Sequence, residues 1–382
     1  MLKVANRGQI SSFIVMDVMR AANEQETSLG DVIHLEVGQP STGAPRGVVA
    51  AAKAALDSNK LGYTDSFGIP ELREAIARHY QDRYGVVVPV ERIVATTGSS
   101  GAFVLSFLSA FNPDDRVAIM SPGYPCYNNI LSAFGIKTVM LEGTAEGHYQ
   151  PTLELLDAAS TDQPLDGLIV ASPSNPTGTI LSDNFGAISG WCEAQGVRLV
   201  SDEIYHGISY GRPVPTAAGL NDEAIVINSF SKYFSMTGWR LGWMIVPPDL
   251  LRAVECLAQN LFISPPSLSQ HAAVAAFQCH DECEAYLEVY RRNRALLLEG
   301  LPNVGFDRLA PAEGAFYLYA DIAHLTNDSQ DFCKRLLEDT GIATTPGVDF
   351  DPARGHAHMR FSYCASTPDI ETALERLAVW QR

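Results

Sequence analysis

Short apolar segments alternate with helical segments between residues 92 and 246, and this rhythm constrains the fold more than any other feature of the sequence. The apolar segments are rich in valine, isoleucine and leucine, and they lie at residues 93–95, 117–120, 139–141, 168–171, 199–200, 224–228 and 243–246. Continuous apolar runs of this length are typical of strands buried on both faces of a parallel sheet. The sequence therefore predicts an α/β fold in which helices cover both faces of a mostly parallel sheet.

The same pattern divides the chain into parts. Its 382 residues leave room for two or three domains. We assign residues 41–280 to a large domain. A long helix at about 282–300, followed by further strands and helices, predicts a smaller α/β domain over residues 281–382. Residues 1–40 carry an amphipathic helix at 11–28, and we expect this N-terminal segment to contribute to the small domain.

Composition and charge exclude several classes of partner. The net charge of −17 argues against nucleic acid and anionic membranes. No apolar run reaches the roughly 18 residues that span a bilayer, and no signal-peptide pattern opens the chain. Seven cysteines with scattered spacing indicate reduced thiols and a cytoplasmic location. Cys279 and Cys283 flank His280, but no second ligand pair accompanies them, so we expect no metal site.

Lys232 occupies an unusual position for a lysine. The chain has only six lysines, and the other five fall among charged or turn residues. Lys232 follows the buried run at 224–228 and precedes the one at 243–246. Taken alone, it would be a solvated loop lysine. An amine held in a partly buried site, however, has a lowered pKa and becomes a nucleophile that can form a Schiff base.

Polar motifs follow several of the other predicted strands. The turn at 96–101 combines glycines and serines at a helix start, which can bind a phosphate or simply cap the helix. The segment Asn175-Pro176-Thr177-Gly178 can be no more than a turn, and Asp202 can be a helix N-cap. Because ligands in such sheets bind at the carboxyl ends of the strands, these motifs predict one shared site. Gly-Lys-Ser/Thr and Gly-x-Gly-x-x-Gly motifs are absent, which argues against a P-loop and a nicotinamide dehydrogenase.

Together the motifs resemble one enzyme family. Ser229-Phe230-Ser231-Lys232 followed by Gly238-Trp239-Arg240-Leu241-Gly242 is similar to the lysine motif of the class I/II aminotransferases, and matching motifs recur in the family's order from Gly38 to Arg360. These are pyridoxal-phosphate (PLP) enzymes of the aspartate aminotransferase fold, fold type I. The resemblance implies a large domain with a mostly parallel seven-stranded sheet, a smaller α/β domain and a homodimer with shared active sites.

The resemblance also implies roles for individual residues around the PLP ring. Lys232 would hold PLP covalently and act as the general base. Asp202 would keep the ring nitrogen protonated, Tyr205 would donate to the phenolic oxygen, and Tyr124 would stack on the ring. Asn175 would donate to the phenolic oxygen and to the substrate carboxylate. Glu203, next to Asp202, is expected to face away and to pair structurally.

The remaining roles concern the phosphate and the substrate carboxylate. The implied phosphate ligands are Ser99, Ser100, Gly101, Ser229, Ser231, Arg240 and, from the neighbouring subunit, Tyr63. Arg360 would clamp the substrate α-carboxylate opposite the backbone of Gly38. Taken alone, Arg360 could equally form a domain-packing salt bridge.

The predicted activity is transfer of an amino group from an L-amino acid to a 2-oxo acid by a ping-pong mechanism. A neutral or apolar donor is favoured, because residues 102–112 carry no lysine or arginine and the N-terminal helix offers Phe13, Ile14 and Val15. Arg20 or an arginine of the partner could still serve aspartate or glutamate. The alternatives are a C–S β-lyase or an aminocyclopropane-carboxylate synthase on the same fold. A PLP-sensing regulator is disfavoured by the acidity and by the few residues that precede Gly38.

Overall fold

The alternating apolar segments form one seven-stranded sheet in the computed structural model, which describes residues 2–58, 60–181 and 183–380. Strand β8 runs antiparallel to both of its neighbours, β2 and β7, and the other pairs are parallel. The strand order is β2 (Ile93–Thr96), β8 (Gly242–Ile245), β7 (Ile225–Ser229), β6 (Arg198–Asp202), β5 (Gly167–Ala171), β3 (Arg116–Ser121) and β4 (Lys137–Glu142). The predicted mostly parallel α/β sheet is confirmed.

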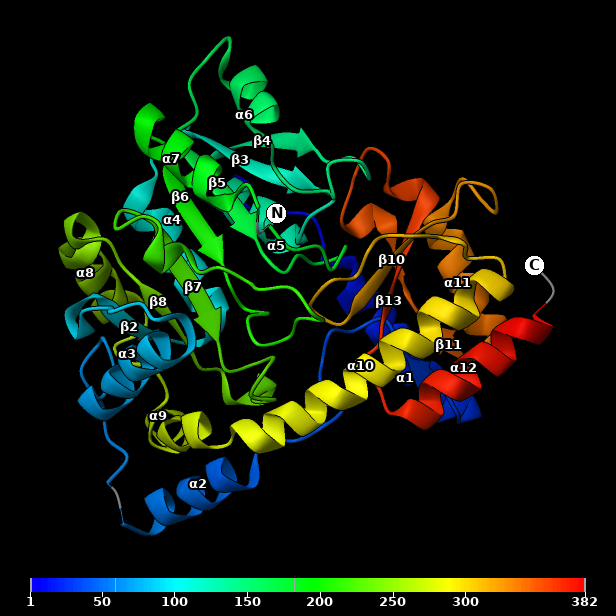
Figure 1. Cartoon of the computed structure of the whole chain (residues 1–382), viewed down its shortest axis with the longest axis horizontal. Coiled ribbons are helices and arrows are strands. Elements are labelled where there is room, and N and C mark those ends of the chain that lie inside the picture. Colours follow the sequence, from blue (N-terminus) through cyan, green and yellow to red (C-terminus); the bar gives the residue numbers. More distant parts are fainter. Residues whose placement is uncertain (1, 59, 182, 381–382) are drawn as a thin grey trace.

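Helices cover both faces of this sheet (Figure 1). Ile169 of β5 packs with α4 and α8 on one face, while its neighbours Leu168 and Val170 pack on the opposite face. Both faces of the strand are therefore apolar, which explains why the strands appear in the sequence as continuous apolar runs. Each fully buried side chain of this size contributes about 1.5–3 kcal/mol. The helices around the sheet are α3 (Pro70–Tyr84), α4 (Gly98–Ala110), α5 (Pro125–Phe134), α6 (Leu153–Ser160), α7 (Phe185–Gln195), α8 (Leu251–Leu261) and α9 (Ser267–Ala273).

A second, antiparallel sheet forms the other part of the structure. Its four strands lie in the order β12 (Thr345–Pro346), β13 (His358–Ser362), β10 (Tyr317–Asp321) and β9 (Arg308–Leu309). Helix α10 (His280–Asn303) extends from the region of α9 to this second sheet, alongside α12 (Thr367–Val379) (Figure 1). Helix α11 (Ser329–Thr340) completes this part.

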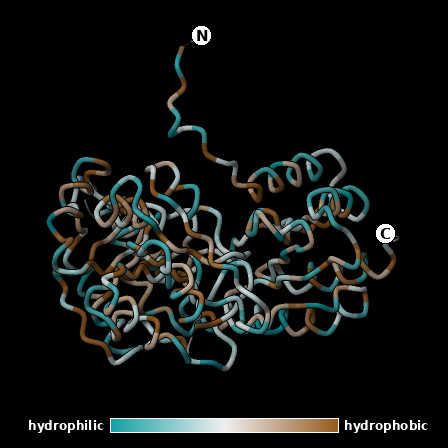
Figure 2. The backbone as a smooth tube through the Cα atoms, turned by 90° about the horizontal axis from the view of Figure 1, so that it is seen from above, coloured by the Kyte–Doolittle hydropathy of each residue, from teal (hydrophilic) through white to brown (hydrophobic). Residues whose placement is uncertain are grey.

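The N-terminal segment joins the second part of the structure. Strand β1 (Ile33–His34) pairs in parallel with β11 (Ile342–Ala343), and α1 (Ile14–Leu29) packs Ala22 against Leu337 and Ala343. Residues 2–12 are exposed, and the first of them extend away from the molecule (Figure 2). The domain boundaries at 40/41 and 280/281 stay a prediction, and Met1, Gln381 and Arg382 of those domains lie outside the described residues. Helix α2 (Arg46–Ser58) packs against α9, at the bottom of the view in Figure 1.

Among the described parts of the chain, no helix combines the length and the apolar character that crossing a membrane requires.

Candidate active site

Most of the predicted site residues meet in one cavity of about 240 Å³ between the carboxyl ends of the parallel strands and the second sheet. A larger cavity of about 750 Å³ lies beside α3 and contains none of them. The predicted residues that line the smaller cavity are Gly38, Ser99, Ser100, Tyr124, Asn175, Asp202, Tyr205, Ser231, Lys232, Arg240 and Arg360. Residues from distant parts of the sequence thus face one another as the resemblance implies.

Lys232 lies in the loop after β7 and reaches into the cavity. Its Nζ donates a hydrogen bond to the Gly38 carbonyl at 2.6 Å. Burial lowers the pKa of this amine to about 8, and the nearby charges of Arg360 and Arg240 act in the same direction. A cation surrounded by protein and by other cations is poorly solvated, so its neutral form becomes accessible near neutral pH. The neutral amine is the form that can act as a nucleophile or as a base.

Asp202 ends strand β6 and is only 4% exposed. Its carboxylate accepts hydrogen bonds from the Tyr127 hydroxyl and, at 3.1 Å, from the backbone N–H of Ile204. Burial raises the pKa of Asp202 to about 6. The ion pairs found among the described residues do not include this carboxylate. A buried carboxylate of this kind fits a cationic group placed in the cavity.

Glu203, the next residue, points away from the cavity. It accepts hydrogen bonds from the hydroxyls of Ser201 and Thr216 at 3.1 and 2.8 Å and from the Ala217 N–H at 2.8 Å. The prediction that Glu203 pairs structurally is confirmed.

Tyr205 and Tyr317 form a buried pair at the back of the cavity. Their hydroxyl groups are 2.7 Å apart, and both side chains are almost fully buried. The ring of Tyr317 lies 4.2 Å from the guanidinium carbon of Arg360. Gly38 packs directly against the Tyr317 hydroxyl, so that a Cβ atom at position 38 would overlap it. Gly38 therefore allows the chain to pass close to both Tyr317 and Lys232.

Arg360 points from β13 toward the cavity and is 2% exposed. Its guanidinium donates to Asn175 Oδ1 at 2.7 Å and to the Glu36 carbonyl, and the Phe350 ring lies 4.7 Å from its central carbon on one side. Within the described residues its Nε has no hydrogen-bond partner and no carboxylate pairs with it. The domain-packing salt bridge, the alternative for this residue, is thus not found there. A positioned arginine with an unused donor fits a carboxylate ligand.

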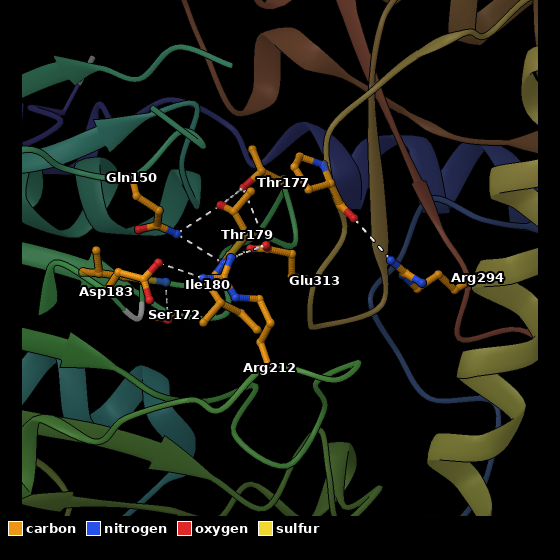
Figure 3. Close-up of polar contacts among 11 residues, drawn as sticks. Gln150, Ser172, Thr177, Thr179, Ile180, Asp183, Arg212, Arg294 and Glu313 are labelled. Atoms are coloured by element: carbon orange, nitrogen blue, oxygen red, sulfur yellow. Dashed lines mark hydrogen bonds and ion pairs between the residues drawn. The ribbon is translucent and has the colours of Figure 1, made fainter. Parts of the chain in front are cut away.

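A hydrogen-bond network holds the turn that carries Asn175 (Figure 3). Gln150 Nε2 donates to the carbonyl and hydroxyl of Thr179 at 3.1 and 3.0 Å. One oxygen of Glu313 accepts a backbone N–H of the turn at 3.1 Å, and the other accepts from Arg212 at 2.6 Å. Asn175 therefore projects from a turn that is held in place, and its amide oxygen is oriented toward Arg360.

The start of α4 lies beside Arg240 and forms a candidate anion subsite with it. A Cβ at Gly98 would lie 2.5 Å from Nη2 of Arg240, so glycine lets the guanidinium approach this turn. Ser99, Ser100 and Ser231 line the same end of the cavity. A helix N-terminus beside an arginine and hydroxyl donors fits a phosphate.

The structure does not bring three of the predicted phosphate ligands to the cavity of their own chain. Ser229 lies behind Ser231, to whose hydroxyl it donates at 2.9 Å. Gly101 is buried within α4 against Thr97. Tyr63 is 84% exposed on the surface.

Sequence reasoning missed other residues of the site. Tyr127 and Tyr317 contact predicted residues, while Val37 and Gln39 line the cavity. Tyr127 lies one helical turn after Tyr124, a spacing that could have identified it. Tyr317 belongs to an apolar strand, and nothing local distinguishes it from a core residue.

Comparisons with known proteins agree with this geometry. A family model described as aminotransferase class I and II matches residues 30–377. The chain is 52% identical over 383 residues to valine–pyruvate aminotransferase of Mycobacterium tuberculosis, with 99% of this chain and 98% of the relative covered. The crystal structure of an aminotransferase from Mycobacterium tuberculosis superposes with a TM-score of 0.97 at 52% identity, covering 100% of this chain and 99% of that one.

A more distant structure has the same fold. Aspartate aminotransferase from Thermus thermophilus with maleate superposes with a TM-score of 0.92 at 32% identity, covering 99% of each chain. The resemblance stated from the motifs is therefore confirmed. Because the family model spans most of the chain and these relatives align over nearly its whole length, the protein is an aminotransferase and the chain belongs to the class I and II family.

Proposed function

We propose that this aminotransferase uses PLP held by Lys232 to move the amino group of a neutral, branched L-amino acid such as valine to pyruvate. The observation that carries the donor class is the apolar wall that Phe13, Val15 and Met16 contribute to the cavity that contains Arg360. A substrate side chain that faces this wall is desolvated, which favours hydrocarbon over charge. The name of the relative at 52% identity points to the same pair of substrates.

The charges of the cavity support a neutral donor. The cationic residues that line it, among those described, are Lys232, Arg240 and Arg360. Arg240 lies at the anion subsite, and Arg360 is poised for the α-carboxylate, so neither is left for a second carboxylate. Arg20 pairs with Asp17 at 2.6 Å and does not line the cavity. A dicarboxylate donor would then need an arginine from a partner chain.

The residues present fit PLP. The Asp202 carboxylate suits a protonated ring nitrogen, Arg240 with Ser99, Ser100 and Ser231 suits the phosphate, and the amine of Lys232 suits the aldehyde carbon. Bound PLP would supply an electrophilic carbon and a ring that withdraws electrons from the substrate Cα. We also propose that Ser229 supports Ser231, and that Gly101 shapes the helix start rather than touching the phosphate.

The chain's own groups perform the remaining work. The amine of Lys232, with its lowered pKa, would be the base that takes up the Cα proton and moves it during the transfer. Arg360 and Asn175 hold the α-carboxylate and so fix the orientation of the Cα–H bond. Tyr205, hydrogen-bonded to Tyr317, would hold the phenolic oxygen of PLP, and the buried Val15 would limit the access of water to the reacting carbon.

We further propose a homodimer in which Tyr63 reaches the partner's phosphate. Tyr63 has exposed apolar neighbours, because the loops at 62–64 and 264–267 are hydrogen-bonded to each other and Ile263 is 50% exposed. Leu56 of α2 and Leu261 are also exposed, at 59% and 49%. Exposed apolar side chains gathered in this way mark an interface. All seven cysteines are free, which supports the cytoplasmic location.

The test is an absorbance spectrum of the purified protein loaded with PLP, recorded with a panel of amino acids. L-valine should convert the visible band to the shorter-wavelength pyridoxamine form, and pyruvate should reverse the change. Lys232→Ala should do neither. L-aspartate outcompeting every neutral donor would refute the donor class. Ammonia released with an unchanged band would favour a lyase.

A further inference from the structure

We infer that Asp349 is a positioning residue whose buried carboxylate fixes the start of α1, so that Phe13, Val15 and Met16 form the wall that receives the donor side chain. This inference rests on the proposed function, because it explains how the apolar donor pocket keeps its shape. Asp349 itself does not line the cavity that contains Lys232.

The contact between Asp349 and α1 joins two ends of the sequence. Its Oδ1 accepts the N–H of Ile14 at 2.9 Å, and its Oδ2 accepts the N–H of Val15 at 3.1 Å. These are the first N–H groups of the helix, which have no partner within it. The residue at the N-cap position, Phe13, supplies no side-chain cap. A carboxylate more than 300 residues away therefore caps the helix, where it also interacts favourably with the helix dipole.

The turn that Asp349 caps carries the residues that shape the donor pocket. Phe13, Val15 and Met16 all line the cavity, and Val15 is only 3% exposed. The Phe13 ring meets the Tyr124 ring edge-on, with centroids 5.7 Å apart. Both carboxylate oxygens of Asp349 are used, which restricts translation and rotation of this first turn. The wall is thereby fixed relative to the ring of Tyr124.

Asp349 also belongs to the same rigid unit as the carboxylate clamp. It closely follows β12, in which Thr345 pairs with Arg360 of β13. The next residue, Phe350, packs on the Arg360 guanidinium and accepts the Gly123 N–H through its carbonyl at 3.0 Å. The distance between the group that holds the α-carboxylate and the wall that receives the side chain is thus set by one short segment. Such a link selects donors by the size of their side chain.

A role in helix capping alone would predict a different effect of Asp349→Ala on the choice of donor. A cap that only stabilised α1 would lower the stability of the protein when removed and would affect every donor equally. The segment before Phe13 is exposed over residues 2–12, and the first of these residues extend outward (Figure 2). Its side-chain hydrogen bond to the rest of the protein is a long one, from the Asn129 amide to the Ser11 carbonyl at 3.4 Å. Loss of the carboxylate should therefore loosen the wall itself. A branched side chain that reaches the wall should suffer, whereas the methyl group of alanine should not.

The experiment compares L-valine with L-alanine as donors for wild type, Asp349→Ala and Asp349→Asn, each loaded with PLP. In Asp349→Ala, kcat/KM for L-valine should fall about 10- to 100-fold, mainly through KM, because two hydrogen bonds to a charged group are lost. The value for L-alanine should change less than about threefold. Asp349→Asn, whose amide oxygen still accepts one N–H, should lie between the two. The matched control is Asp17→Asn, an exposed acidic residue in the same helical turn, which should leave both donors unchanged.

A second measurement follows the wall directly. Arg20 of α1 is an exposed trypsin site. Cleavage after it should be faster in Asp349→Ala than in wild type, and an equal rate would overturn the inference that Asp349 fixes this turn. If kcat/KM falls by the same factor for L-valine and L-alanine in Asp349→Ala, the inference is overturned while the donor class stands. A wild type that prefers L-aspartate to L-valine would instead overturn the proposed function, and this inference with it.

Discussion

Gly38→Ala should disrupt the site by overlap with a single side chain. A Cβ atom at this position would overlap the hydroxyl of Tyr317 and lie 2.8 Å from Cζ of the same ring. Tyr317 cannot move away easily, because its hydroxyl is bonded to Tyr205 and its ring packs against Arg360. The backbone at Gly38 has no positive φ, so the substitution tests steric overlap and not strain.

The expected magnitude follows from the packing. Overfilling a buried site costs about 1–3 kcal/mol, which in a protein of this size lowers Tm by about 1–4 °C. The Gly38 carbonyl also accepts the Lys232 hydrogen bond, so a shift of this backbone moves the amine. We expect the donor KM to rise and kcat to fall. Tyr317→Phe removes the overlapping oxygen and by itself costs about 1 kcal/mol for the lost hydrogen bond to Tyr205.

The assay is a double-mutant cycle followed by thermal unfolding and by donor kinetics. The double variant should be more stable than the sum of the single effects predicts, by roughly 1 kcal/mol, because the two residues share one overlap. Gly43→Ala is the matched control, since a Cβ there meets nothing within 4 Å. If Gly38→Ala matches Gly43→Ala in Tm and in donor KM, the reasoning is refuted.

Three other predictions concern the charged groups. Arg360→Lys should raise the donor KM about 10- to 100-fold in steady-state kinetics, because an ammonium cannot reproduce the planar fork, and an unchanged KM would contradict the clamp. In protein stripped of PLP, the rate of PLP capture should rise about tenfold per pH unit up to about pH 8 and stay constant above that pH, because only the neutral amine of Lys232 attacks. A rate that does not change with pH in stopped-flow absorbance would contradict the lowered pKa of Lys232. Glu203→Ala leaves the Thr216 hydroxyl and the Ala217 N–H buried without an acceptor, so it should lower the free energy of unfolding by about 1–3 kcal/mol. An unchanged Tm would show that water replaces the carboxylate.

The sequence predicted the fold well where strands are buried on both faces. Each apolar run between residues 92 and 246 became a strand, because neighbouring residues such as Leu168 and Ile169 pack on opposite faces. The N-terminal helix was predicted to begin at residue 11, but it begins at Ile14. Its start depends on the carboxylate of Asp349, a contact that no local pattern reveals. Helix α4 begins at Gly98, inside the turn at 96–101 where the sequence predicts a helix start, and glycine tolerates the positive φ of 70° at that position.

The site was predictable to the extent that its residues follow strands. Asn175, Asp202 and Lys232 each come directly after an apolar run, and the topology of a parallel sheet gathers such positions at one edge. Tyr317 is different, because its neighbours in the sequence are also buried and aromatic or aliphatic. Its role arises from the way β10 lies beside β13, which brings it under Arg360. Contacts of this kind depend on tertiary packing and have no signature in a single sequence.

The two central ionisable groups of the cavity are shifted in opposite directions by the same cause. Burial raises the pKa of Asp202 to about 6 and lowers that of Lys232 to about 8, so each group moves toward its neutral form. This desolvation is a free-energy cost that the folded protein carries, and a ligand with a cation for Asp202 and an anion for Arg240 would offset it. Binding of such a ligand should therefore lower the pKa of Asp202 again. The same burial, which costs free energy in the folded protein, thus favours a cofactor with separated charges, which is the chemical character of PLP.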